Sequence, residues 1–251
     1  MRWRLTFLLL ASTALSCWSD NVPVETNPSA SDQSYLVSDP TPEPQEVLTK
    51  KVLETYSNQT EVARPGRNKI EIDIIQKGQF REYHSDNLAV IRLYSKDNSG
   101  GWDLRQTLEI ADDAIDDADV KLSDYNGDGL KDVTFVSSIA ARGANVMRTL
   151  LIYNKDSDNL VHIENSEEFP NLEYSRKLKC ITAWSVYGGT STDFARIEGN
   201  QLKSFATVEN FEGFRTVTVI DQHGKQNVIS RNKISDEDVY IRYTNYRPLE
   251  H

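Results

Sequence analysis

Lys69-Ile70-Glu71-Ile72-Asp73-Ile74 is the stretch that decides the fold class. Its isoleucines alternate with charged residues. Because successive side chains of a β-strand point to opposite faces, the isoleucines would share one face of a strand. The stretch therefore predicts a strand that packs one face on a hydrophobic core and presents the other to water.

Short runs of similar character recur over most of the chain beyond residue 49, separated by polar turns such as Asn98-Ser99-Gly100-Gly101. This pattern predicts an all-β domain, either an antiparallel sandwich or a small propeller-like array, with at most one or two short helices. One short helix is expected at 47–56. Further strands are expected at 87–94, 102–110, 133–137, 147–153, 180–186, 194–198, 202–208, 214–221 and 239–243.

The N-terminal residues have the pattern of an export signal. Arg2 and Arg4 precede an uncharged, mostly apolar run of eleven residues, 5–15. A membrane-spanning helix needs about 20 residues, so this run is too short to be a permanent anchor. A basic segment followed by a short apolar one is typical of a signal peptide, which we assign to residues 1–16.

Ala14-Leu15-Ser16-Cys17 resembles the bacterial lipobox, in which the cysteine is diacylated and the chain is cut just before it. The resemblance implies that Cys17 is lipidated and that the protein is held in the periplasm on a membrane. Where Gram-negative sorting applies, that membrane is the outer one. Two or three acyl chains anchor a protein stably. The alternative is an ordinary signal peptide that leaves Cys17 unmodified.

Residues 17–48 are predicted to comprise the lipidated cysteine and the disordered tether that follows it. They contain five of the eight prolines and few aliphatic residues, so they bury too little apolar surface to offset the entropy of ordering. Residues 49–251 then form a single β-rich domain, which is long enough to build its own core. The five prolines are Pro23, Pro28, Pro40, Pro42 and Pro44.

The charge of the chain restricts its partners. Removing residues 1–17 takes away two arginines and changes the formal net charge from −10 to −12. An acidic chain repels nucleic acid, so nucleic acid is excluded as a partner, whereas calcium or a basic protein is favoured. Once Cys17 is acylated, Cys180 is the one remaining cysteine, so no internal disulfide is expected.

The most specific motif is Asp124-Tyr125-Asn126-Gly127-Asp128-Gly129-Leu130-Lys131-Asp132. Calcium takes six to eight oxygen ligands, and alternate residues of a tight loop can direct their oxygens to a common centre. A glycine at the sixth position permits the sharp turn that such a loop needs. The predicted ligands of Ca²⁺ are the side chains of Asp124, Asn126, Asp128 and Asp132 and the carbonyl of Leu130.

The loop departs from an EF-hand at the twelfth position, where Phe135 replaces the bidentate glutamate and a strand rather than a helix follows. It resembles the calcium loops of FG-GAP and related β-repeat proteins, which implies a structural site. The alternative is a plain Asn-Gly/Asp-Gly turn with solvated acids. The acidic cluster before the loop lacks a suitably placed turn glycine and is interpreted as solvated; it comprises Asp112, Asp113, Asp116, Asp117 and Asp119.

The sequence contains no convincing catalytic set, so an enzyme is not expected. His84, His162 and His223 lie far apart and follow no metal-ligand spacing, and the nucleophile elbow G-x-S-x-G is missing. Cys180 begins an apolar run, which favours a buried side chain over a nucleophile.

Phe169-Pro170-Asn171-Leu172-Glu173-Tyr174 precedes a predicted strand pair that spans the turn 187–190. Together with the calcium loop, this phrase resembles a family of periplasmic lipoproteins, over about residues 88–202. Some members are immunity proteins that inhibit lysozyme-like effectors of antibacterial secretion systems, and their fold is similar to that of bacterial lysozyme inhibitors. The resemblance implies a lysozyme-like cell-wall hydrolase as the partner.

Inhibitors of this kind insert a Ser/Gly/Tyr-containing loop into the cleft of the hydrolase. The matching candidates are Ser185, Tyr187, Gly188 and Gly189, which otherwise form a plain hairpin turn. A second candidate contact is the loop 141–145. Two functions remain open at this stage: an inhibitor of a peptidoglycan hydrolase, or an envelope lipoprotein whose calcium loop only stabilises the fold.

Overall fold

The computed structural model describes residues 50–76, 87–112 and 118–247. The expected signal peptide, Cys17, the tether and His84 lie outside these ranges, as does most of the acidic cluster. The described chain forms three sheets, each built from consecutive strands in antiparallel pairing. The all-β, antiparallel prediction is therefore confirmed, and helical structure in these ranges is limited to short 3-10 turns.

The first sheet contains β1 (Lys51–Asn58), β2 (Asn68–Gln76), β3 (Asn87–Lys96) and β4 (Trp102–Asp112). The second contains β5 (Lys121–Ser123), β6 (Asp132–Ala140), β7 (Asn145–Asn154) and β8 (Asn159–Ile163). The third contains β9 (Glu173–Ser175), β10 (Cys180–Val186), β11 (Thr190–Glu198), β12 (Gln201–Phe211), β13 (Phe214–Ile220) and β14 (Gln226–Lys233). The 3-10 helices are η1 (Ala141–Gly143), η2 (Ser166–Glu168) and η3 (Asp236–Asp238).

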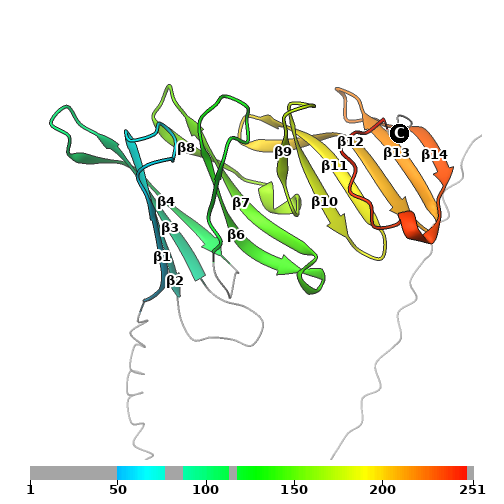
Figure 1. Cartoon of the computed structure of the whole chain (residues 1–251), viewed down its shortest axis with the longest axis horizontal. Coiled ribbons are helices and arrows are strands. Elements are labelled where there is room, and N and C mark those ends of the chain that lie inside the picture. The colour runs from blue at the N-terminus through cyan, green and yellow to red at the C-terminus, as the bar shows by residue number, and fades with distance from the viewer. Residues whose placement is uncertain (1–49, 77–86, 113–117, 248–251) are drawn as a thin grey trace, which may run out of the picture. The chain divides into compact units, whose positions relative to one another are not determined.

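The sheets are layered in chain order, as Figure 1 shows from blue through green to orange. One core lies between the first two sheets, where Ile70 and Ile72 meet Phe135 and Leu151. A second lies between the second and third sheets and includes Leu150. The second sheet is therefore buried on both faces, and residues 149–153 of β7 are all buried. The arrangement is sandwich-like at each of the two contacts.

The alternating stretch Lys69–Ile74 lies within β2. Ile70, Ile72 and Ile74 are buried, while the side chains between them are partly exposed. This is the expected result for a strand with one face on the core.

Two expected elements are wrong. The helix expected at 47–56 overlaps β1, which pairs along β2, because the β-branched and aromatic residues of this segment suit an edge strand. The strand expected at 239–243 is irregular chain after η3. Tyr243 there packs on the core of the third sheet and bonds through its N–H to Thr192 Oγ1 at 3.0 Å. Side-chain packing thus replaces a strand ladder.

Across the three described ranges, no helix has the length and apolar character needed to cross a membrane.

Candidate functional site at the junction of the second and third sheets

The predicted calcium loop connects β5 to β6, and a strand follows it as expected. The Asp124 carboxylate accepts the backbone N–H groups of Gly127 at 2.6 Å and Gly129 at 2.9 Å. Asn126 Oδ1 and Asp124 Oδ1 both accept the N–H of Asp128, at 2.9 and 3.1 Å. Because they share one donor, these two oxygens lie close together. The loop is thus tightly turned around the side chains of its first three predicted ligands.

Asp132 occupies a different environment from the other predicted ligands. Its side chain is fully buried and accepts the N–H groups of Tyr125 at 2.7 Å and Tyr153 at 2.9 Å. Burial raises the pKa of Asp132 to about 7 in spite of these two hydrogen bonds, and the charges of Asp128 and Asp124 add to the rise. Asp132 therefore holds the base of the loop to β7, with the acids of the loop close by.

The residues of the loop partly fit a calcium ion. Asp124, Asn126 and Asp128 bring oxygens to the exposed end of the loop, and oxygen ligands are those that calcium prefers. Both carboxylate oxygens of Asp132 already accept backbone hydrogen bonds inside the fold. Within the described ranges, no group of three or more His, Cys, Asp or Glu side chains is arranged to hold a metal ion. Calcium therefore stays a prediction.

The loop also contacts the third sheet through Tyr174 of β9. A side chain at Gly127 would collide with the Tyr174 hydroxyl, and Gly127 has a positive φ of 80°. Glycine is required here both for the backbone conformation and for the close approach. Tyr174 is the last residue of the segment 169–174, so this segment contacts the calcium loop.

The candidate partner loop follows β10 on the same sheet. Tyr187, Gly188 and Gly189 form the turn between β10 and β11, which Tyr187 N–H closes by donating to the Gly189 carbonyl at 3.0 Å. Gly188 has φ 89°, and a side chain at Gly189 would collide with the carbonyl of Asn210. Both glycines are therefore required by this turn, and Ser185 lies within β10 just before it.

Tyr187 is exposed but held in place. Its side chain is 46% exposed, and its ring stacks on Phe211 with the ring centres 6.2 Å apart. Its hydroxyl donates to Glu209 Oε1 at 2.6 Å. Burial and this hydrogen bond raise the pKa of Tyr187. A tyrosine that is both exposed and fixed loses little entropy when it binds a partner.

Two asparagines bring the second candidate loop beside the first. The Asn145 side chain donates to the Val186 carbonyl at 3.0 Å and accepts the Val186 N–H at 2.9 Å. Asn171 donates to the carbonyls of Ala144 at 2.7 Å and Trp184 at 2.9 Å. The loops 141–145 and 185–189 are therefore linked, and the phrase 169–174 holds them through Asn171.

A pocket of about 530 Å³ lies along the same junction. Arg148 and Arg242, two of its charged residues, make ion pairs inside the protein with Asp119 and Glu173. Each of these two arginines is therefore paired with an acid of the same chain. The lining includes Tyr125, Arg148, Asn171, Leu172, Trp184 and Arg242.

Of the other candidates, Cys180 is buried as expected, and burial raises the pKa of its thiol. The sequence missed Asp193, Glu209 and Phe211, which lie on β11 and β12 beside the Tyr187 loop. No local motif marks them, because antiparallel pairing of β11 with β12 brings them together.

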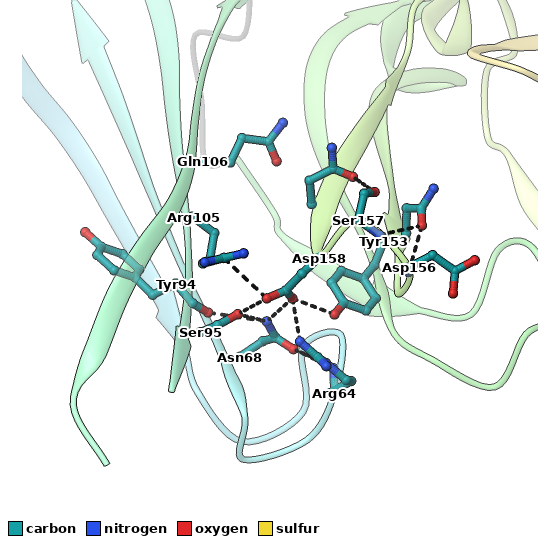
Figure 2. Close-up of polar contacts among 12 residues, drawn as sticks. Arg64, Asn68, Tyr94, Ser95, Arg105, Gln106, Tyr153, Asp156, Ser157 and Asp158 are labelled. Atoms are coloured by element: carbon teal, nitrogen blue, oxygen red, sulfur yellow. Dashed lines mark hydrogen bonds and ion pairs between the residues drawn. The ribbon is translucent and has the colours of Figure 1, made fainter. Parts of the chain in front are cut away.

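The sequence also missed Asp158, which joins the first two sheets (Figure 2). It lies in the turn from β7 to β8, and its Oδ1 accepts from Arg64 at 2.6 Å and Tyr153 Oη at 2.7 Å. Oδ2 accepts from Ser95 at 2.6 Å. Burial alone would raise the pKa of Asp158, but these hydrogen bonds, another from Asn68 and the Arg64 charge lower it to about 2.

No family model matches the chain, and no curated protein matches it. One solved structure that is similar is described as "a Xanthomonas Type IV Secretion System related protein". It is 13% identical with a TM-score of 0.45, and the match covers 72% of this chain and 96% of that chain. The comparisons therefore establish no family.

Proposed function

We propose that this protein is a lipid-anchored periplasmic binding protein that inhibits a lysozyme-like peptidoglycan hydrolase and is not itself an enzyme. In this proposal Cys17 anchors the chain, and the β domain presents Tyr187 to the hydrolase. The acidic chain, with a formal net charge of −10, attracts a basic enzyme over distance.

The observation that carries the proposal is the exposed and preorganised Tyr187. Its ring projects from a turn whose two glycines leave no bulk around it, and Phe211 and Glu209 hold it in place. Tyrosines in such rigid settings are frequent binding hot spots, because a large contact area is gained at low entropic cost. The linked loop 141–145 extends the surface that meets the partner.

Calcium has a supporting part in this proposal. Bound by Asp124, Asn126, Asp128 and the Leu130 carbonyl, it would neutralise acids that lie above the buried Asp132 carboxylate. Through Tyr174 the same loop contacts the third sheet, which carries Tyr187. The ion would therefore stiffen the junction that supports the binding loop, without touching the hydrolase.

The second candidate is an envelope lipoprotein whose calcium loop only stabilises the fold. Asp132 favours it, because both its oxygens bond to the backbone and so tie the loop into β7. In this case the protein has no hydrolase partner.

The deciding experiment is capture of envelope and secreted proteins on the full chain, followed by a hydrolase assay on peptidoglycan. The first proposal predicts recovery of a wall hydrolase whose activity falls when the chain is added. Tyr187→Ala should abolish that inhibition without lowering the melting temperature. Leu104→Ala, which removes a 55% exposed apolar side chain from β4 of the first sheet, is the control and should inhibit like the parent.

Failure to capture any hydrolase would leave the structural lipoprotein as the better account. The anchor is tested separately by membrane fractionation. Cys17→Ser should move the protein from the membrane to the soluble periplasm, and unchanged partitioning would refute acylation at that residue.

A further inference from the structure

The first and third sheets each contain the same pair of side chains, a tyrosine hydroxyl that donates to a glutamate. On the first sheet Tyr94 donates to Glu71 at 2.9 Å. On the third Tyr187 donates to Glu209 at 2.6 Å. The first pair is completed by Lys69, whose Nζ lies 2.8 Å from Glu71 and 4.2 Å from the centre of the Tyr94 ring.

The pair on the third sheet has no such cation. Across the described ranges, none of the ion pairs or cation–ring contacts includes Tyr187 or Glu209. Arg231, a basic residue on the nearby strand β14, instead stacks over Phe214 with 4.3 Å between guanidinium and ring centre. Both sheets thus contain a tyrosine–glutamate pair, but in the described ranges only the pair on the first sheet has a neighbouring cation.

A second carboxylate adds to the negative charge of this face. Asp193 pairs with Thr207 in the ladder between β11 and β12, which places it diagonally across from Glu209 on the same face. Burial raises the pKa of Asp193, and the charge of Glu209 adds to this rise, although Thr207 and Ser191 donate hydrogen bonds. Like Glu209, Asp193 makes no ion pair in the described part of the chain.

The rings beside these acids are accessible from outside. Tyr187 is 46% exposed and Phe211 is 42% exposed, and the two stack on each other. A cation over an aromatic ring is attracted by its negative face, and a carboxylate alongside adds a charge-assisted hydrogen bond. A basic side chain is the chemical group that satisfies both features together.

We propose that the face formed by Tyr187, Phe211, Glu209 and Asp193 binds a lysine or arginine side chain of the partner protein. That side chain takes the position which Lys69 takes in the first sheet, beside the glutamate and over the tyrosine ring. The inference rests on the proposed function, since it names the chemistry by which the inhibitor loop recognises its hydrolase. It also explains why an acidic binding face accompanies the exposed tyrosine.

The test is an NMR titration of the full chain with three tripeptides: Gly-Arg-Gly, Gly-Lys-Gly and Gly-citrulline-Gly. Citrulline has nearly the shape of arginine without its charge. The two basic peptides should shift the ring signals of Tyr187 and Phe211 saturably, while the citrulline peptide should not. Equal shifts with citrulline would overturn the inference.

Two variants separate charge from shape. Glu209→Gln keeps the side-chain size and should weaken binding of the arginine peptide on the order of tenfold, because it removes a charge-assisted contact. Glu198→Gln is the matched control, since Glu198 is an exposed acid of the same sheet that pairs with Lys203. The control should bind like the parent; full binding by Glu209→Gln would contradict the proposal.

The outcomes also separate this inference from the proposed function. If the chain inhibits a hydrolase and Glu209→Gln inhibits it equally well, the basic-residue contact is wrong and the inhibitor function stands. If the arginine peptide binds at Tyr187 but no hydrolase is captured, the contact is right and the partner is of another kind.

Discussion

Two aspartates that point into the fold differ in their surroundings. Asp158 joins the first two sheets, whereas Asp132 ties the acidic loop, which contacts the third sheet, to β7. Asp158, at the first junction, meets the guanidinium of Arg64 and has a pKa of about 2. Asp132, at the second, meets only backbone N–H groups and neighbouring acids and has a pKa of about 7. The described chain supplies a cation to the first junction and none to the carboxylate of the second.

The first junction neutralises its own buried charge, whereas the second does not. At the first, side chains from both sheets neutralise and saturate Asp158, and Gln106 bonds twice to the Leu160 backbone, at 3.0 and 2.7 Å. At the second, neutral amides such as Asn145 and Asn171 make the links, and the acidic loop stands beside them. We therefore expect the second junction to respond to calcium and the first to acid below about pH 4.

The largest expected effect is at the first junction. Asp158→Ala leaves Arg64, Ser95 and Tyr153 without their shared acceptor and should lower the free energy of unfolding by about 3 kcal/mol. Chemical denaturation measures it. Asp156→Ala removes an exposed acid from the same turn and serves as the control, with a change under about 0.5 kcal/mol. Equal losses of stability in the two variants would contradict a stabilising role of Asp158 at this junction.

At the second junction, the expected effect depends on calcium. At a calcium concentration 100 times its dissociation constant, binding should add about 2.7 kcal/mol to stability, and Asp124→Ala with Asp128→Ala should abolish that gain. Thermal melts in calcium and in chelator measure the gain. Asp221→Ala is the matched control, because Asp221 also accepts backbone N–H groups in a hairpin turn. A loss of equal size in calcium and in chelator would refute the calcium site.

Below about pH 4, acid should act mainly on the first junction, because Asp132, whose pKa in the folded protein is about 7, is already protonated there. The folded pKa of Asp158, about 2, lies below the value near 3.9 of an unfolded aspartate, so the unfolded chain binds the proton first as pH falls. The stabilisation is complete above about pH 4 and is lost towards pH 2, by about 2 kcal/mol. Urea unfolding of the parent and of Asp158→Asn between these pH values isolates this contribution. Parallel curves for the two proteins would contradict it.

The smallest expected effect concerns the contact between the calcium loop and Tyr174. Gly127 and Gly129 both have positive φ, but only Gly127 lies against the Tyr174 hydroxyl. Alanine at either position costs about 1 kcal/mol for backbone strain, and at Gly127 the collision adds to this cost. Adding Tyr174→Phe to Gly127→Ala should restore the stability lost to the collision. Adding it to Gly129→Ala should not restore any stability. The measurement is the denaturation midpoint of each alanine variant, with and without Tyr174→Phe.

Much of the fold was predictable from local pattern. The Ile70–Ile74 alternation became β2, and the expected strand 180–186 coincides with β10. Failure occurred where packing outweighs pattern: β1 is a strand because β2 offers it a partner edge, and residues 239–243 are irregular because their side chains bond to the third sheet. Asp158 was missed for a similar reason, since its partners Arg64 and Ser95 are distant in sequence.

The sequence by itself determined the all-β class and the position of the acidic loop between two strands, because strand alternation and tight turns depend on neighbouring residues. Only the tertiary structure decided that Asp132 faces inward, that Asn145 links two loops, and that Asp193 and Glu209 share a face with Tyr187. Those relations depend on strand register and sheet packing. A change of one residue in register would turn each side chain to the opposite face, and no local pattern specifies that choice.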